Sequence, residues 1–228
     1  MSIRCVCFDL DDTLWDCEAV ISRAEQQLYQ WLTVHQPRIS ERYSPAELIN
    51  SRISFTRQNP ELHYDLGKLR RSWLSELAAE AELETDWVEA AFEHFLQARN
   101  QVDFFPGVLE QLQQLRQENY ILGSITNGNA DVHSVGLGDI FHFSHNSASA
   151  GVSKPHPAIF EQALEISGLQ SHQMVYVGDD PEKDIIGASS AGLRTIWYNP
   201  FRRELSRAAT PDAIMTSFNQ LAFIVRTL

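Results

Sequence analysis

Four short apolar runs, separated by segments with helical spacing, constrain the fold of this chain most strongly. The runs are rich in residues that favour strands and lie at 3–8, 120–126, 174–177 and 194–198. Such runs are typical of strands that are buried on both faces of a parallel sheet. In the segment 159–166, by contrast, apolar residues recur with the period of a helix. Alternating strands and helices predict right-handed βαβ units, and therefore an α/β fold with a doubly wound parallel sheet.

The segment between residues 16 and 102 differs from the rest of the chain because it contains no convincing strand run. Ser44, Pro45 and Glu47 form a capping box with proline at the first helical position, which predicts a helix start. Asp86 has the spacing of a second N-terminal cap. We therefore predict an all-helical insert that interrupts an α/β domain just after its first strand. The predicted boundaries place residues 1–15 and 103–228 in the α/β domain and residues 16–102 in the insert.

The charge and composition of the chain limit its partners. Of the 228 residues, 43% are hydrophobic, and the net charge is −12. This acidic balance disfavours nucleic acid, because phosphate backbones attract basic surfaces, and the patch of Arg202, Arg203 and Arg207 is too small to change this. No apolar stretch approaches the ~20 residues that span a bilayer, and three cysteines suit neither a disulfide framework nor a zinc site. We expect a cytoplasmic monomer or homodimer with neither nucleic acid nor a membrane as partner.

Acidic residues follow the first and the third apolar run where each run ends. Asp9 and Asp11 follow the first run, and Asp179 follows the third. Because parallel strands bring their carboxyl ends to one edge of the sheet, where open α/β sheets bind ligands, Asp179 is expected to face Asp9 and Asp11. Carboxylates packed together raise one another's pKa, and a divalent cation removes this cost. Oxygen ligands suit Mg²⁺, so we predict a Mg²⁺ site, with Asp184 as a further ligand or as a support for the others.

Two other segments offer groups that suit an anionic substrate. Thr126 and Asn127 end the second run and provide a hydroxyl and loop amides that can hold phosphate oxygens. Lys154, just before Pro155 and a predicted helix, is one of only three lysines and can act as a point charge on phosphate. Taken singly, an ordinary Asn-Gly turn and a surface lysine are the better explanations of these residues. Their order and spacing relative to the acidic turns make the phosphate-binding interpretation the stronger one.

The four segments that carry these residues resemble the motifs of the haloacid dehalogenase superfamily, and closely those of its phosphatase branch. Members of this branch have a Rossmann-like core and insert a helical cap domain after the first strand, so the resemblance covers the whole chain. Asp9 and Asp11 match the first motif, Thr126 the second, Lys154 the third, and Asp179 with Asp184 the fourth.

The resemblance implies two-step phosphoryl transfer from a small phosphorylated metabolite. Asp9 attacks phosphorus and forms an aspartyl-phosphate, Asp11 acts as acid and then as base, and Lys154 is the third catalytic residue. The implied phosphate-binding residues are Leu10, Asp11, Thr126, Asn127 and Lys154. The implied Mg²⁺ ligands are Asp9, the backbone carbonyl of Asp11, Asp179 and, directly or indirectly, Asp184.

Substrate specificity is expected in the cap. The motif runs at 8–14, 125–130 and 177–180 are similar to those of bacterial phosphatases that act on flavin mononucleotide and on the phosphoribitylamino-uracil precursor of riboflavin. Trp15, next to the site loop, is interpreted mainly as a packing residue, with stacking on an aromatic substrate as the less favoured alternative. The candidate substrate contacts in the cap are Arg52, Arg57, His63, Tyr64, Lys68, Arg70 and Arg71.

Several alternatives remain open at this point. A sugar phosphomutase shares all four motifs and differs in passing the phosphoryl group to substrate rather than to water. A haloacid dehalogenase also uses an aspartate nucleophile but needs neither a metal nor the acid at Asp11. A phosphonatase needs a Schiff-base lysine, for which only Lys68 is available in the cap. A non-catalytic metabolite-binding protein usually lacks the nucleophile or the acid, and a receiver domain is far shorter and has no helical insert.

Overall fold

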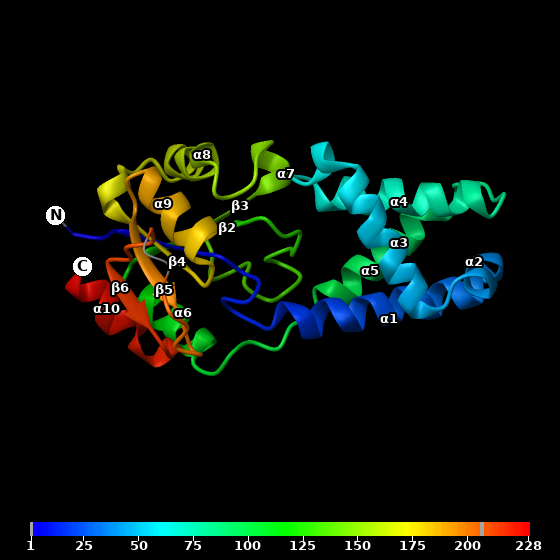
Figure 1. Ribbon diagram of the computed structural model, residues 1–228. Helices are drawn as coiled ribbons and strands as arrows, with labels where there is room; N and C mark the ends of the chain where they lie inside the picture. The colour runs from blue at the N-terminus through cyan, green and yellow to red at the C-terminus, as the bar shows by residue number, and fades with distance from the viewer. Residues whose placement is uncertain (1, 206–207) are drawn as a thin grey trace.

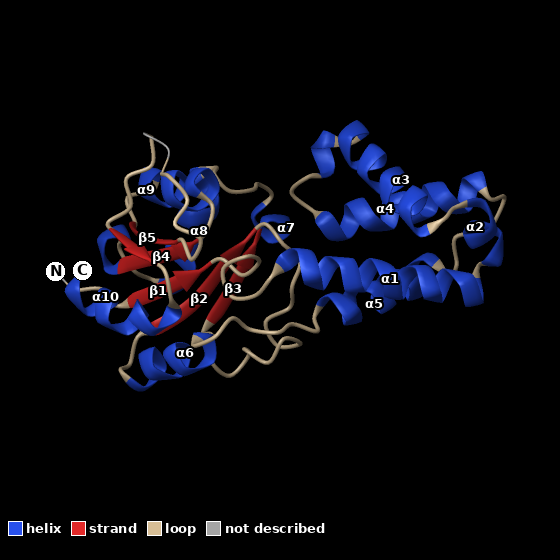
Figure 2. Cartoon of the chain, turned by 60° about the horizontal axis from the view of Figure 1, so that its bottom comes forward, coloured by secondary structure: helices blue, strands red, loops and turns tan. Residues whose placement is uncertain are grey.

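A six-stranded, all-parallel sheet forms the centre of the computed structural model, which describes residues 2–205 and 208–228. The strand order is β3-β2-β1-β4-β5-β6, so the predicted α/β, doubly wound fold is confirmed (Figures 1 and 2). The strands are β1 (Cys5–Phe8), β2 (Ile121–Thr126), β3 (Phe143–Asn146), β4 (Met174–Gly178), β5 (Arg194–Tyr198) and β6 (Ala213–Met215). The chain moves from β1 toward β3 and then returns to β4, on the other side of β1. The direction of winding therefore reverses beside β1, which is where ligands bind in open α/β sheets.

The four predicted strand runs correspond to β1, β2, β4 and β5, whereas β3 and β6 were not predicted. The sequence of β3 is Phe-Ser-His-Asn, which lacks the continuous apolar character of a doubly buried strand. β6 has only three residues. Both lie at the edges of the sheet and pair with one neighbour each, so their burial pattern differs from that of the central strands.

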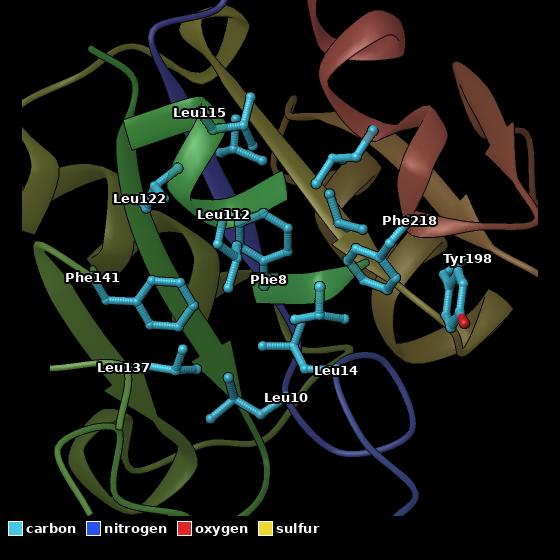
Figure 3. Close-up of a cluster of buried hydrophobic side chains, with 14 of the residues drawn as sticks. Phe8, Leu10, Leu14, Leu112, Leu115, Leu122, Leu137, Phe141, Tyr198 and Phe218 are labelled. Atoms are coloured by element: carbon cyan, nitrogen blue, oxygen red, sulfur yellow. The ribbon is translucent and has the colours of Figure 1, made fainter. Parts of the chain in front are cut away.

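Helices cover both faces of the sheet (Figure 2). Apolar residues of α6 and α10 pack with those of β1 on one face, and α8 and α9 pack on the other. Figure 3 shows the first of these clusters, in which Phe8 of β1 lies near Leu112 of α6. The helices of this part are α6 (Val108–Gln117), α7 (Ser147–Ala150), α8 (Pro157–Ser167), α9 (Gly187–Ser190) and α10 (Leu221–Thr227). Shorter helical turns are η2 (Ser171–Gln173), η3 (Pro181–Ile186) and η4 (Phe218–Gln220).

Between β1 and α6 the described chain is helical and has its own hydrophobic cluster. Its buried members lie between Ala24 and Ala98, and the helices stand apart from the sheet in both views (Figures 1 and 2). The helices are α1 (Cys17–His35), α2 (Pro37–Arg42), α3 (Pro45–Gln58), η1 (Pro60–Leu62), α4 (Leu66–Glu80) and α5 (Val88–Arg99). We propose that they form the cap domain, with the boundaries at 15–16 and 102–103 that the sequence predicts. Within 2–205 and 208–228, no helix combines the length and the apolar character that crossing a membrane requires.

The two predicted helix caps in this insert have different outcomes. The capping box of α3 is present: the Glu47 carboxylate accepts hydrogen bonds from the N–H and hydroxyl of Ser44, whose hydroxyl accepts from the Glu47 N–H. The prediction of a helix cap at Asp86 was wrong. The helix begins after Trp87, which is itself in helical conformation, and Asp86 makes no capping hydrogen bond. A turn at 85–88, closed by the Val88 N–H and the Thr85 carbonyl, takes its place.

Candidate active site

Three carboxylates meet at the carboxyl edge of the sheet. Asp9 follows β1, Asp179 follows the neighbouring strand β4, and Asp184 lies in η3, the helical turn after β4. Carboxylate oxygens of these residues lie within 4.8 Å of one another. Asp9 and Asp184 are buried, and Asp179 is half-buried. The structure therefore brings together the acids that the sequence placed at this edge, with Asp184 as a full member of the group.

Lys154 joins the same group from the other side. Its Nζ lies 2.8 Å from Asp9 Oδ1 and 2.7 Å from Asp184 Oδ1, and it donates a 2.8 Å hydrogen bond to the Tyr176 hydroxyl. The lysine is buried, so the interpretation as a plain surface lysine was wrong. Its main chain is held by Asn127, whose side chain accepts from the Lys154 N–H and donates to the Lys154 carbonyl. The loops after β2 and before α8 are thus connected beside Asp9.

Burial and mutual repulsion raise the pKa of two of these acids. Burial raises the pKa of Asp9 to about 7, and Asp184 adds to this effect, although the nearby Lys154 ammonium opposes it. Burial, together with the Asp184 carboxylate, raises the pKa of Asp179 to about 6, against the effect of Arg203. Burial tends to lower the pKa of Lys154, but Asp184 and Asp9 raise it overall, so the lysine stays charged. One buried ammonium does not offset three carboxylates.

The acid group has the chemistry of a divalent-cation site. All its donors are oxygens, as Mg²⁺ requires, and the raised pKa values show that more positive charge is needed there. The donors are also held in place. The Asp179 carbonyl accepts hydrogen bonds from Trp197 Nε1 at 2.9 Å and Arg203 Nη2 at 3.0 Å, and Asp184 Oδ2 accepts from the Asp180 N–H. Arg203, assigned from the sequence to a surface basic patch, is therefore a support of this site; Arg207 of that patch lies outside the described residues.

The Asp11 carboxylate contacts a residue of the helical insert. Arg99, the last residue of α5, donates from Nη2 to both Asp11 oxygens at 2.7 and 2.6 Å, and Trp15 Nε1 donates to Oδ1 at 2.8 Å. Arg99 was not predicted as a site residue, and 88 positions separate it from Asp11. Trp15 is completely buried against Phe104. The packing interpretation of Trp15 is therefore confirmed rather than the stacking alternative, and its indole N–H also holds the Asp11 carboxylate.

The loops after β1 and β2 offer hydrogen-bond donors beside Asp9. Across the described residues, the backbone N–H groups of Leu10, Asp11 and Asn127 have no acceptor. The Thr126 hydroxyl, at the end of β2, accepts a 3.0 Å bond from the Gly128 N–H. A Cβ at Gly128 would lie 2.4 Å from Asp11 Oδ2, so a larger residue there would displace the Asp11 carboxylate. The residues predicted to bind phosphate thus lie on the loops after β1 and β2 and in the segment before α8 that Asn127 joins to them.

A cavity of about 210 Å³ extends from Asp11 into the insert. Of the seven cap residues named from the sequence, Arg52 and Arg70 line it. The others do not: Arg57 is exposed, His63 contacts the Thr56 carbonyl, and Arg71 pairs with Glu89. Tyr64 and Lys68 do not line the cavity either. The residues that line the cavity are Cys17 and Ile21 of α1, Arg52 and Thr56 of α3, Leu66, Leu69, Arg70 and Trp73 of α4, Phe95 and Arg99 of α5, and Asp11, Gly128 and Asn129 of the α/β part.

Known proteins resemble this chain along most of its length. The family model of haloacid dehalogenase-like hydrolases matches residues 3–192. The 5-amino-6-(5-phospho-D-ribitylamino)uracil phosphatase YigB of Escherichia coli (strain K12) is 29% identical over 207 residues, which cover 89% of this chain and 86% of that protein. A glyceraldehyde 3-phosphate phosphatase of Pyrococcus furiosus is 29% identical over 202 residues, which cover 86% of this chain and 80% of that protein.

The same similarity holds for solved structures. A crystal structure described as a 2-haloacid dehalogenase from Pseudomonas syringae pv. Tomato DC3000 superposes with a TM-score of 0.90. It is 38% identical to this chain, and the match covers 98% of each. By sequence and by structure, the chain belongs to the haloacid dehalogenase-like hydrolase family.

Proposed function

We propose that this protein is a Mg²⁺-dependent phosphatase that hydrolyses small phosphomonoesters through an aspartyl-phosphate on Asp9. The observation that carries the proposal is the convergence of Asp9, Asp179 and Asp184 at one sheet edge, with the Asp11 carboxylate beside them. This arrangement supplies a nucleophile, oxygen ligands for a cation and a separate acid. The phosphatases among the curated relatives support the same class of reaction.

In the proposed first step, an Asp9 oxygen attacks phosphorus in line, and the bond from phosphorus to the ester oxygen breaks. Asp11 gives its proton to the leaving oxygen. The N–H groups of Leu10 and Asn127, the Thr126 hydroxyl and the Lys154 ammonium stabilise the other phosphate oxygens. Asp9, the Asp11 carbonyl, Asp179 and Asp184 would hold a Mg²⁺ ion, which would supply positive charge against the negative charge of the reacting groups.

In the proposed second step, water attacks the aspartyl-phosphate and Asp11 takes its proton. The acyl-phosphate bond breaks, Asp9 is regenerated as a carboxylate, and inorganic phosphate leaves. Arg99 and Trp15 donate hydrogen bonds to the Asp11 carboxylate and would orient it for both transfers. Because its position is set by two buried side chains rather than by solvent, Asp11 has the pre-organised geometry that acid–base catalysis needs.

We infer that the leaving group is small. The cavity between Asp11 and the insert, which would receive the leaving group, has a volume of about 210 Å³. This is below the range of roughly 300–1,000 Å³ that is usual for drug-sized ligands. The riboflavin precursor 5-amino-6-(5-phospho-D-ribitylamino)uracil and flavin mononucleotide remain candidates, because of the motif resemblance and the E. coli relative. Glyceraldehyde 3-phosphate, named for the Pyrococcus relative, is a smaller candidate. Because the cavity is small, we expect faster turnover of the smaller compounds.

The test is phosphate release from a panel of these compounds and of sugar phosphates, with Mg²⁺ and then with chelator. We expect release that stops on chelation and returns with added Mg²⁺. Release that chelator leaves unchanged would remove the metal from the proposal. Isomerised sugar phosphate without free phosphate would instead indicate a mutase.

A second candidate function is dehalogenation, because of the description of the Pseudomonas structure. An aspartate nucleophile serves that reaction too. However, dehalogenation has no need for the acid group at Asp179 and Asp184 or for a carboxylate at position 11. Halide release from 2-haloacids, measured in parallel with phosphate release, separates the two functions. We expect no halide.

A further inference from the structure

The cavity between Asp11 and the insert combines apolar walls with arginines. Trp73 and Phe95 form part of the wall, together with leucine and isoleucine side chains from α1 and α4. Arg52, Arg70 and Arg99 also line it. Arginine guanidinium groups in a cavity of this size are partly desolvated, and they need anionic partners.

The anionic partners in the protein do not balance the arginines. Glu25, which is buried, lies 2.9 Å from Arg52 Nε and 2.8 Å from Arg70 Nη2. Asp11 is the partner of Arg99. Three arginines therefore face two carboxylates, and one positive charge is left over. In a protein with a net charge of −12, a positively charged cavity next to the reaction site is a distinct feature.

Unused hydrogen-bond donors point to the same conclusion. Arg99 is 1% exposed, and its Nε and Nη1 have no hydrogen-bond partner in the described part of the chain. Arg52 Nε is near Glu25 but is not directed at it in a hydrogen bond. Arg70 is already engaged, since it donates twice to Glu25 and lies over the Phe95 ring. Buried donors of this kind are costly without an acceptor, so Arg52 and Arg99 are the two cavity arginines with donors that the described protein leaves unsatisfied.

We propose that this cavity binds a second anionic group on the leaving group of the substrate, a carboxylate or a second phosphate, through Arg52 and Arg99. This inference rests on the proposed phosphatase function and narrows its substrate class. The anion would lie near the leaving oxygen, because Arg99 also holds Asp11, the proposed acid. The apolar walls would enclose the short carbon chain between the two charged groups. A substrate with an uncharged leaving group would leave the arginine donors unsatisfied.

The decisive comparison uses substrates of one skeleton that differ in charge. 3-Phosphoglycerate carries a carboxylate where glycerol 3-phosphate carries a hydroxymethyl group, and propanediol bisphosphate tests a second phosphate. We expect kcat/KM at least about tenfold higher for one or both of the doubly anionic compounds than for glycerol 3-phosphate, since charge-assisted hydrogen bonds are the stronger ones. Equal kcat/KM for all three, with clear phosphate release, would overturn this inference and leave the phosphatase standing.

Substitution of Arg52 separates recognition of the anion from positioning of Asp11. In the described structure, Arg52 forms no hydrogen bond or ion pair with Asp11. Arg52→Gln should lower kcat/KM for the doubly anionic substrate more than it lowers kcat/KM for glycerol 3-phosphate, so that most of the preference is lost. Arg52→Lys should restore part of the preference. Arg57→Gln is the matched control, since Arg57 lies on the same helix but is exposed and does not line the cavity. An unchanged preference in Arg52→Gln would contradict the assignment.

Binding to an inactive variant keeps the test independent of turnover. In Asp9→Asn, 3-phosphoglycerate should raise the melting temperature more than glycerol 3-phosphate does at equal concentration. If the unaltered protein released no phosphate from any compound, the phosphatase proposal would fail, and this binding preference would still decide whether the cavity selects a second anion. Equal rises in melting temperature with the two compounds would refute the proposed selection of a second anion.

Discussion

Asp9 is the residue on which the proposed chemistry depends. Asp9→Asn keeps the size of the side chain and removes the nucleophile, so turnover should fall by more than about 1,000-fold. Folding should survive, because Lys154 keeps its contact with Asp184 and the substitution removes a buried charge. Steady-state kinetics and circular dichroism test the two expectations together. A variant that folds and retains full activity would exclude Asp9 as the nucleophile.

The raised pKa values at the acid group predict how stability depends on pH and metal. The folded pKa of Asp9 is about 7 and that of Asp179 about 6, both above the unfolded value. Between about pH 4 and pH 7 the metal-free folded state holds protons that the unfolded chain has lost, so its stability should fall as pH rises through this window. Mg²⁺ competes with these protons and should therefore stabilise more at about pH 8 than at about pH 5.

Thermal unfolding with and without millimolar Mg²⁺ measures this effect. Saturation a hundredfold above Kd is worth about 2.7 kcal/mol, which for a chain of this size is a rise of several degrees in Tm. Asp179→Asn, which removes one proposed ligand, should reduce the rise. A rise of the same size at both pH values would show that the raised carboxyl groups are not the site of binding.

At the scale of single elements, the two helix starts in the insert make a matched pair. Ser44→Ala removes a hydroxyl that takes part in the capping box of α3, and it should lower the free energy of unfolding by about 1 kcal/mol. Asp86→Ala should change it by less than about 0.5 kcal/mol, because Asp86 is exposed and caps no helix. Urea unfolding of both variants provides the comparison. Equal losses would mean that the α3 cap contributes nothing specific.

The elements also show which local signals are reliable. Continuous apolar runs predicted β1, β2, β4 and β5, because central parallel strands are buried on both faces and must be apolar throughout. The edge strands β3 and β6 carry no such constraint and were missed. The capping pattern was right at Ser44, where Pro45 and Glu47 reinforce it, and wrong at Asp86, where the pattern stands without proline and a turn ending at Val88 competes with it.

At the scale of the whole molecule, the insert and the α/β part have separate hydrophobic clusters. Leu28 lies in the first and Leu112 in the second, and both are completely buried. Leu28→Ala and Leu112→Ala should each cost about 2–5 kcal/mol in the part to which the residue belongs. If the clusters unfold independently, calorimetry should resolve two transitions, of which each variant shifts a different one. A single transition that both variants shift equally would show that the two parts unfold together.

Much of this protein was determined by its sequence alone, and the limit has a physical reason. Strand and helix periodicity place Asp9, Thr126 and Asp179 at the ends of parallel strands, and parallel strands end at one edge, so local patterns were enough to bring them together. The contact of Arg99 with Asp11 depends instead on how the insert packs against the core, and 88 residues separate the two. No local sequence pattern predicts a contact between residues that lie so far apart in the sequence. Tertiary packing alone therefore decided that Arg99 contacts Asp11 and that Arg52 and Arg99 line the same cavity.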